Sequence, residues 1–328
     1  MDVLKNPYRG AGFKGGFEHV PAPSVDADAP RALLARCPEH GITPMVQALG
    51  LHIKDERARM GLGSFKALGA AYVIAHAAQQ GSLEGRTYVT ASAGNHGLSV
   101  AAGAKVFGAK AVIYLAQTVP DAFADRLRAM GADVEIEGAD YEASMAAAQA
   151  AAVTNGWTLL SDSSWKGYFE LPHRLMEGYL AMAAECTEQM EKPTHIFLQA
   201  GVGGLAGACA ALFRDVWGAD PVITVVEPAF APAIYDSIKA GGFTTSSGPV
   251  SDMGRLDCKE ASLIALKGLS RDADAFALIS EEEAFDVLPK LAELGLASST
   301  SGAAGIAAAL LSDLPRDARV LCIMSEGA

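Results

Sequence analysis

The chain has 328 residues, of which 50% are hydrophobic and 20% are charged, and its formal net charge is −12. This composition excludes a disordered or low-complexity protein and allows two lobes of ordinary domain size. The acidic balance, without a basic cluster, argues against nucleic acid and anionic membranes as partners.

Cysteine usage and hydropathy indicate a cytoplasmic protein. The five cysteines are odd in number and form no Cys-x-x-Cys pair, so we interpret them as reduced thiols that mostly fill the core. The first 20 residues contain no apolar run typical of a secretory signal, and no apolar stretch approaches the roughly 18 residues that span a membrane. The cysteines are Cys37, Cys186, Cys209, Cys258 and Cys322.

The first 40 residues are expected to be irregular, because five prolines interrupt any helix. We interpret this segment as an arm that lies over the body of the molecule, toward a partner subunit of a homodimer. The prolines are Pro7, Pro21, Pro23, Pro30 and Pro38.

Strands and helices alternate along the rest of the chain, after a short extended piece at 42–45. Strands are predicted at 51–56, 86–90, 110–115, 133–137, 157–160, 195–199, 222–226, 275–279 and 319–324. Helices are predicted at 67–76, 97–107, 121–130, 141–154, 171–190, 204–216, 259–267, 280–294 and 301–311. Ser280 and Glu283 form a capping box for the eighth helix. This order predicts an α/β fold with mainly parallel sheets flanked by helices.

Four segments with candidate chemistry follow predicted strands, at the edge where α/β folds bind ligands. The first places Lys66 at the start of a helix, behind two glycines and Phe65. A lysine there opposes the positive end of the helix dipole, so we expect a lowered pKa and a free amine that attacks carbonyls. Considered alone, such a lysine is usually only solvated.

The other three segments carry groups that could bind an anion or the ring of a ligand. At residues 90–97, small residues let backbone N–H groups bind a substrate carboxylate at a helix N-terminus, and Asn95 could hold a phenolate-type oxygen. At residues 199–205, three glycines between a buried strand and a helix are typical of a phosphate-binding loop. At residues 323–327, the hydroxyl of Ser325 could bond to a neutral ring nitrogen. With a reactive lysine, these features describe a site for pyridoxal phosphate.

On these residues the chain resembles the fold-type II, tryptophan synthase β-like family of pyridoxal phosphate enzymes over nearly its whole length. The matching motifs are Ser64-Phe65-Lys66, Ser92-Ala93-Gly94-Asn95-His96 and Gly201-Val202-Gly203-Gly204-Leu205, in this order. Within the family it is most similar to the diaminopropionate ammonia-lyases. That similarity rests on residues 53–56, on Asp162-Ser163-Ser164-Trp165-Lys166-Gly167-Tyr168, and on residues 256–260 and 325–327.

The resemblance implies two lobes, each a mainly parallel sheet, with pyridoxal phosphate in the cleft between them. Residues 1–54 and 166–328 would form the large domain, and residues 55–165 a smaller mobile domain. The implied cofactor-binding residues are Lys66, Phe65, Asn95, Gly201, Val202, Gly203, Gly204, Leu205 and Ser325. The implied substrate-binding residues are Ser92, Ala93, Gly94, Asn95 and Asp162. Lys66 and Asp162 would be catalytic, no metal is expected, and the family is commonly dimeric.

The implied activity is α,β-elimination on a small amino acid, which yields a 2-oxo acid and ammonia. Three alternatives stay open: a serine, threonine or 3-hydroxy amino acid dehydratase, a β-replacement synthase, and a nucleotide-binding α/β protein without chemistry. By resemblance Asp162 would lie near the distal amino group of the substrate, and its alternative role is a helix N-cap. We expect His96 to be structural, as is His195, and Trp165 and Tyr168 to be packing residues or substrate walls.

The sequence also departs from the ammonia-lyases. Their carboxylate loop carries an Asp that acts as a base on the D-substrate, and Ala93 occupies that position here. Thr300 replaces a Glu that usually precedes Ser301 and Gly302. The chain ends at Ala328, directly after the ring-nitrogen loop, where relatives continue; we interpret it as a truncated product or a chain with an unobserved tail.

Overall fold

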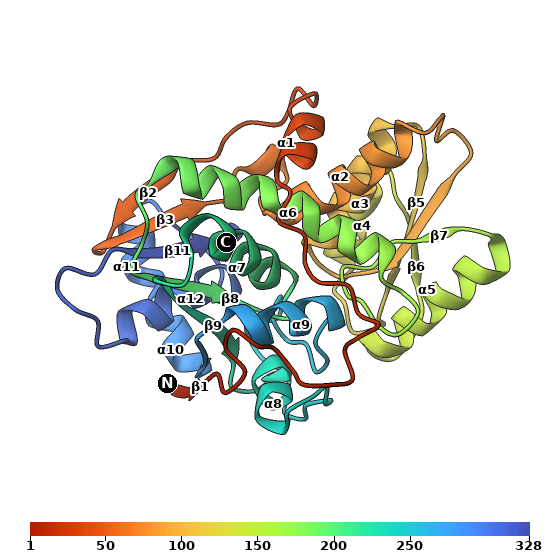
Figure 1. Ribbon diagram of the computed structural model, residues 1–328. Coiled ribbons are helices and arrows are strands. Elements are labelled where there is room, and N and C mark those ends of the chain that lie inside the picture. Colours follow the sequence, from red (N-terminus) through yellow and green to blue (C-terminus); the bar gives the residue numbers. More distant parts are fainter.

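The computed structural model describes residues 1–328, and its strands form two separate sheets (Figure 1). The larger sheet has seven strands in the order β1-β10-β9-β8-β11-β3-β2. Its five inner strands are parallel, and β1 and β2 pair antiparallel at its edges. These strands are β1 (Asp2–Lys5), β2 (Met45–Ala48), β3 (Leu51–Asp55), β8 (His195–Gln199), β9 (Val222–Pro228), β10 (Ala275–Ile279) and β11 (Val320–Met324).

The smaller sheet has four parallel strands in the order β6-β5-β4-β7. They are β4 (Thr87–Ala91), β5 (Lys110–Leu115), β6 (Asp133–Ile136) and β7 (Thr158–Leu159). The two sheets account for the mainly parallel α/β architecture that the sequence predicts. The domain boundaries at 54/55 and 165/166 stay a prediction.

Twelve α-helices connect and cover the strands, with a short 3-10 helix at Arg59–Gly61 ahead of the second. They are α1 (Asp28–Leu34), α2 (Lys66–Ala78), α3 (Asn95–Val106), α4 (Asp121–Ala129), α5 (Tyr141–Asn155), α6 (Glu170–Gln189), α7 (Gly204–Trp217), α8 (Ala233–Ala240), α9 (Leu263–Asp272), α10 (Glu281–Phe285), α11 (Leu288–Glu293) and α12 (Thr300–Leu311). None of them combines the length and hydrophobicity that a membrane crossing requires.

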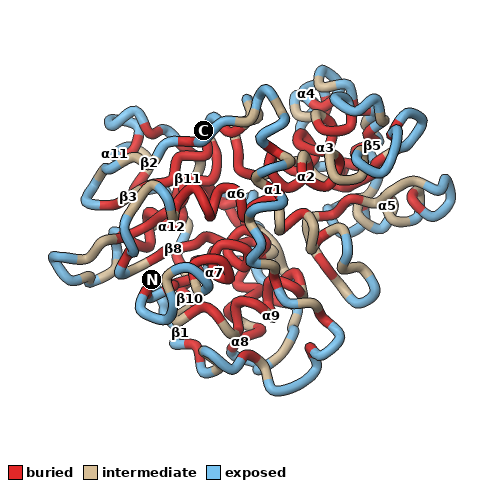
Figure 2. The backbone as a smooth tube through the Cα atoms, turned by 45° about the horizontal axis from the view of Figure 1, so that its top comes forward, coloured by how far each residue is buried: buried red, intermediate tan, exposed pale blue.

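Both faces of the large sheet are buried, because successive side chains of a strand point to opposite faces. In β8, Ile196 and Leu198 belong to the core shared with α6, α7 and α9, whereas Phe197 belongs to the core under α10, α11 and α12. Figure 2 shows buried residues concentrated along α7, α12 and the central strands, with exposed residues at the periphery. The strands are therefore fixed from both sides, so their carboxyl ends form a rigid support for the loops that follow.

The sequence predicted that the first 40 residues are irregular, and this is wrong for two short segments within them, β1 and α1. Strand β1 adds an antiparallel edge to the large sheet beside β10, and α1 packs against α2 and α6. Pro30 lies in the first turn of α1, where a missing N–H and a fixed φ are tolerated.

Two predicted helices also differ in extent. The helix expected at 259–267 begins only at Leu263, because the backbone N–H of Ser262 bonds to the carbonyl of Val202 and holds the preceding segment in a loop. The helix expected at 280–294 begins with the predicted capping box at Ser280 but is divided into α10 and α11. Pro289 at the start of α11 has no N–H with which to continue the helical ladder.

Candidate active site

A cavity of about 300 Å³ lies between the two sheets, beyond the carboxyl ends of β4, β8 and β11. Every site residue expected from the sequence lines it. These residues are Phe65, Lys66, Ser92, Ala93, Gly94, Asn95, Asp162, Gly201, Val202, Gly203, Gly204, Leu205 and Ser325. The chain thus brings together segments up to 260 positions apart, and their individual roles stay predictions.

Lys66 is the first residue of α2, and a tightly bent loop delivers it to the cavity. Met60 has a φ of +50° and Gly63 a φ of +81°, the left-handed region that glycine adopts most readily. The C-terminal segment holds the end of this loop: the Phe65 N–H donates to the Ser325 carbonyl over 3.1 Å, and the Gly327 N–H to the Gly63 carbonyl over 3.1 Å. The backbone that carries Lys66 is therefore joined to the segment after β11.

A buried network of charges anchors the other end of the same loop. Arg59 is completely buried and bonds to Glu56 over 2.7 Å and to Glu185 of α6 over 2.7 Å. Lys54, also completely buried, lies 2.6 Å from Glu185. Two cations and two carboxylates balance one another, so no charge is left uncompensated in the core. The network fixes the start of the loop against β3 and α6.

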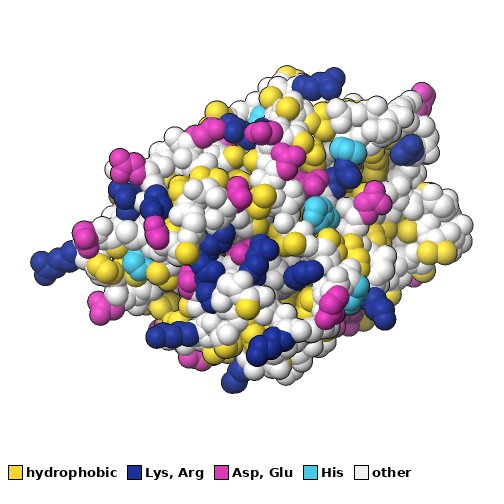
Figure 3. Space-filling model, viewed as in Figure 1, with side chains coloured by type: hydrophobic (Ala, Val, Ile, Leu, Met, Phe, Trp, Pro, Cys, Tyr) yellow, Lys and Arg dark blue, Asp and Glu magenta, His cyan; other side chains and the backbone are white.

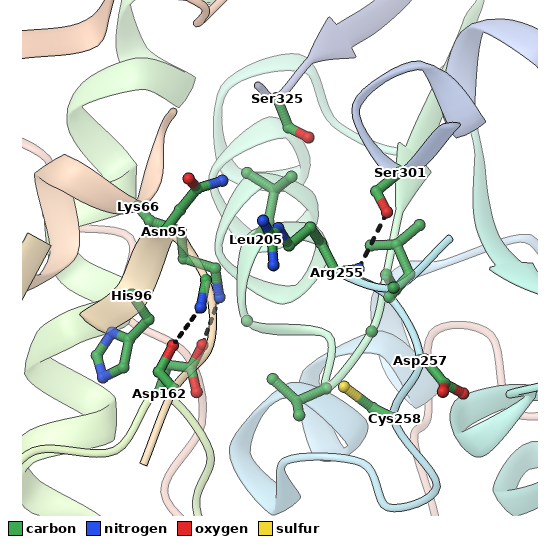
Figure 4. A pocket seen from close by; sticks show the side chains of 18 of the residues that line it. Lys66, Asn95, His96, Asp162, Leu205, Arg255, Asp257, Cys258, Ser301 and Ser325 are labelled. Atoms are coloured by element: carbon green, nitrogen blue, oxygen red, sulfur yellow. Dashed lines mark hydrogen bonds and ion pairs between the residues drawn. The ribbon is translucent and has the colours of Figure 1, made fainter. Parts of the chain in front are cut away.

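Lys66 and Asp162 form an ion pair inside the cavity (Figure 4). Burial lowers the pKa of Lys66, but the charge of Asp162, its hydrogen bond to the lysine and the nearby Tyr179 and Cys258 together outweigh burial, so the pKa stands above its ordinary value. Burial likewise raises the pKa of Asp162, whereas the charge of Lys66, its hydrogen bond to the carboxylate and the nearby His96 together lower it to well below its usual range. The prediction that the helix dipole lowers the pKa of Lys66 is therefore wrong for the protein without bound cofactor. The dipole argument does not include the Asp162 carboxylate, which contacts the lysine directly.

Asp162 is not a helix cap. It follows β7 in an irregular segment, eight residues before α6 begins at Glu170, and its carboxylate bonds to Lys66. The neighbouring residues are structural: the Tyr168 hydroxyl donates to the Leu159 carbonyl over 2.8 Å and accepts the Ser161 N–H over 3.1 Å. The ring of Trp165 stacks on Tyr168 at 4.4 Å between ring centres. These aromatic rings hold the turn that presents Asp162.

The loop after β4 has the compact backbone of an anion site. The Ser92 Oγ accepts the N–H groups of Gly94 over 3.2 Å and of Gly97 over 3.1 Å. A Cβ on Gly97 would lie 2.7 Å from the Ser92 carbonyl oxygen, so only glycine fits the turn. Helix α3 starts at Asn95, and its N-cap residue, Gly94, has no side chain. Because Ser92 already accepts the Gly97 N–H, the first-turn N–H groups left for a ligand are those of Asn95 and His96. His96 is structural, since its Nε2–H donates to the Leu160 carbonyl over 2.8 Å.

The glycine loop after β8 fits a phosphate group. Gly203 has a φ of +93°, and a Cβ there would lie 2.8 Å from the Cδ1 of Ile234. A Cβ on Gly201 would lie 3.0 Å from the Sγ of Cys258. Helix α7 begins at Gly204 with no side-chain cap, so its first backbone N–H groups have no intrahelical partner and can bind an anion. The residues present therefore match the phosphate of the expected cofactor.

The polar lining residues that the sequence did not predict as site residues include Tyr141, Gln199, Arg255 and Glu326. The Gln199 Nε2 donates to the carbonyl of Ile323 over 2.8 Å and so joins β8 to the end of β11. Glu326 accepts a hydrogen bond from the side chain of Asn95, and the guanidinium of Arg255 donates to the Ala93 carbonyl over 2.8 Å. Glu326 and its neighbour Asn95 are 231 residues apart, and no local pattern in the sequence signals such a contact.

The comparisons with known proteins agree with this geometry. The chain matches the family model described as "Pyridoxal-phosphate dependent enzyme" over residues 37–326, and it belongs to that family of enzymes. Its cofactor is pyridoxal phosphate.

Within this family the similarity extends to ammonia-lyases. Diaminopropionate ammonia-lyase of Salmonella typhimurium is 36% identical over 229 residues, which cover 61% of this chain and 57% of the relative. The L-serine dehydratase/L-threonine deaminase of Mus musculus is 30% identical over 70% of this chain and 68% of that protein. The crystal structure of diaminopropionate ammonia-lyase from Escherichia coli in complex with an aminoacrylate-PLP azomethine reaction intermediate has a TM-score of 0.88 at 28% identity and covers 99% of this chain and 93% of the other. The match therefore spans less than two thirds of the length of the Salmonella relative.

Proposed function

We propose that the chain is a pyridoxal phosphate-dependent ammonia-lyase that converts 2,3-diaminopropionate to a 2-oxo acid and ammonia. The partly buried ion pair between Lys66 and Asp162 is the observation that carries this proposal. The similarity to the Salmonella and Escherichia coli ammonia-lyases supports it. Membership in a family of enzymes goes against the alternative of a nucleotide-binding protein without chemistry.

The ion pair links the identity of the substrate to the state of the base. Lys66 must be neutral to remove a proton from the substrate Cα, yet the Asp162 carboxylate raises its pKa. A second ammonium group on the substrate, placed beside Asp162, competes with Lys66 for the carboxylate and so favours the neutral amine. A neutral hydroxyl group in the same place competes much less, because hydrogen bonds between two charged groups are the stronger ones.

The remaining residues bind and orient. The loop at Ser92, Ala93, Gly94 and Asn95 binds the substrate α-carboxylate through backbone N–H groups. The 201–205 loop and the first turn of α7 bind the cofactor phosphate, and Ser325 offers a neutral partner to the ring nitrogen. The bound cofactor supplies an electron sink that stabilises negative charge at the substrate Cα. Lys66 takes the α-proton, and the amino group on Cβ departs beside Asp162 as ammonia. Water then hydrolyses the released 2-aminoacrylate to the 2-oxo acid and a second molecule of ammonia.

Ala93 bears on stereochemistry. By resemblance, an Asp at this position acts as a base on D-diaminopropionate, and a methyl group cannot do so. Lys66 is then left as the base for a single face of the substrate. We therefore propose that the L-isomer is the substrate.

A dehydratase of serine, threonine or a 3-hydroxy amino acid is the second candidate, favoured by the similarity to the mouse enzyme and by Ala93 in a dehydratase-like loop. Ammonia and 2-oxo acid release from L- and D-2,3-diaminopropionate, L-serine, L-threonine and 3-hydroxyaspartate decides between the two. We expect the highest kcat/KM for L-2,3-diaminopropionate. No turnover of either diamino acid, with good turnover of a hydroxy acid, assigns the chain to the dehydratases instead.

We further propose that the protein is a cytoplasmic homodimer. The five unpaired cysteines suit a reducing compartment, and the family resemblance supports a dimer. Light scattering of the purified protein tests the dimer: a mass of one chain at assay concentration would contradict it.

A further inference from the structure

Glu326 occupies a position from which it reaches both lobes of the site. Its backbone pairs with Ser64, two residues before Lys66, and its carbonyl accepts the hydroxyl of Ser298 over 2.6 Å. The side chain is only 8% exposed, and its carboxylate accepts hydrogen bonds from Asn95 and from Ser299 at the start of α12. A buried carboxylate is thus attached to the large sheet and binds a residue that follows a strand of the small sheet.

This contact determines which way the Asn95 amide faces. A carboxylate only accepts hydrogen bonds, so the NH₂ group of Asn95, and not its carbonyl oxygen, must face Glu326. One N–H is used in that bond, and the second is left for an acceptor in the cavity. Without the carboxylate, both orientations of the amide would be open to Asn95.

Arg255 completes a bridge across the mouth of the cavity. Its Nε lies 3.9 Å from the Glu326 carboxylate, and its Nη1 donates to the Ala93 carbonyl over 2.8 Å. The side chain lies so close to Gly94 that a Cβ there would be 3.1 Å from Nη1. In Figure 4, Arg255 extends into the pocket from the side opposite to Lys66. The bridge joins the segment between α8 and α9 to the loop after β4.

We propose that Glu326 is a positioning residue for the cofactor: it turns the NH₂ group of Asn95 toward an acceptor oxygen of pyridoxal phosphate and, with Arg255, holds the small lobe against the large one. The inference goes beyond the proposed function, because it concerns cofactor binding and holds for any substrate. Its test contains no substrate, so failure of the proposed elimination leaves it untouched.

The experiment is a double-mutant cycle on the affinity for pyridoxal phosphate. Glu326→Gln keeps the shape of the side chain but can donate to the Asn95 oxygen, which permits the wrong amide orientation. We expect its dissociation constant to rise about tenfold, the order of one lost hydrogen bond to a charged group. Asn95→Ala should raise the constant by a similar factor, and the double variant no further than Asn95→Ala alone.

The visible absorption of the bound cofactor provides the second readout, because it responds to the hydrogen bond that its ring oxygen receives. Both single variants should shift the band alike. The matched control is Glu281→Gln, which removes a carboxylate that accepts the Ser251 hydroxyl over 2.6 Å outside the cavity and should change neither affinity nor spectrum. If Glu326→Gln does not fold, Glu326→Asp, which withdraws the carboxylate from Asn95, replaces it in the cycle.

Two results would overturn the proposal. One is an affinity of the Glu326 variant within twofold of the wild type. The other is an additive double variant, whose loss equals the product of the two single losses, because Glu326 would then act independently of Asn95.

Discussion

Asp162→Asn should change which substrate the enzyme prefers more than it changes overall activity. The variant keeps the volume of the side chain but removes its charge. The partners in the ion pair, Lys66 and Asp162, are 22% and 17% exposed, so the carboxylate is screened only in part by water. A substrate ammonium about 4 Å from this carboxylate would gain about 4 kcal/mol at an effective dielectric constant of about 20.

Hydrogen bonds to charged groups in proteins contribute less than this electrostatic limit, about 1.5–3 kcal/mol. The variant should therefore lower kcat/KM for L-2,3-diaminopropionate by about 10- to 100-fold. The kcat/KM for L-serine should fall by less than about threefold, a smaller loss than that for the diamino acid, because the hydroxyl of serine is neutral. Loss of Asp162 also lowers the pKa of Lys66. This favours the neutral base more with L-serine, because the second ammonium group of the diamino acid already competes with Lys66 for the carboxylate. Both effects therefore change the ratio of the two kcat/KM values in the same direction.

The assay is ammonia release from both substrates by the wild type, by Asp162→Asn and by a control, Asp257→Asn. Asp257 lines the same cavity but pairs with Lys259 over 2.7 Å, and this pair is as partly buried as that of Lys66 and Asp162. Because its carboxylate bonds to Lys259 and not to Lys66, its removal should leave the ratio within about threefold of the wild type. An equal loss for both substrates in Asp162→Asn would refute the reasoning, because Asp162 would then act on Lys66 and not on the leaving group.

Three further predictions concern the phosphate loop, the buried charges and pH. Gly203→Ala should lower the free energy of unfolding by about 1–2 kcal/mol, because its φ is left-handed, and should also weaken pyridoxal phosphate binding. The control is Gly156→Ala, at a φ of +67° with open space around it, which should cost similar stability but leave binding intact. Equal binding in both variants would contradict the role of the loop. Glu185→Ala should destabilise the protein by about 3–5 kcal/mol in denaturant unfolding, because Glu56 remains as the single carboxylate beside the two buried cations Arg59 and Lys54. A loss below about 1 kcal/mol would show that water reaches them. Burial raises the pKa of Glu227 to about 8 despite backbone N–H donors at the start of α8. The folded state therefore keeps a proton that the unfolded state releases near pH 4.5, so the stability that this group contributes falls as the pH rises from about 4.5 to about 8, by at most about 1.4 kcal/mol per pH unit. Glu227→Gln should lack that part of the dependence of stability on pH.

The strand-to-loop junctions of the site could be predicted from the sequence because their signals are local. Three glycines after an apolar strand predict the loop at residues 201–205, and small residues after another strand predict the loop at Ser92. The alternation of elements then places both loops at the carboxyl edges of parallel sheets. Local chemistry and the order of elements were sufficient for the shape of the cavity.

Contacts between distant segments could not be predicted in the same way. The raised pKa of Lys66 depends on Asp162, 96 residues away, whereas the helix-dipole argument uses only the neighbours of the lysine. The orientation of Asn95 depends on Glu326, which lies on the last loop of the chain. Strand β1 has only four residues, and its largely exposed edge position gives it no continuous apolar pattern. Each of these features is decided by tertiary packing.

The central claim is that Lys66 carries the cofactor and performs the chemistry at the cavity. Borohydride reduction of the holoenzyme makes a covalent link between lysine and cofactor permanent, and peptide mass mapping then locates it. We predict a phosphopyridoxyl label on Lys66 and none on the buried Lys54, with both label and visible absorption band absent in Lys66→Ala. A label on another lysine, or an unchanged band in Lys66→Ala, would contradict the account.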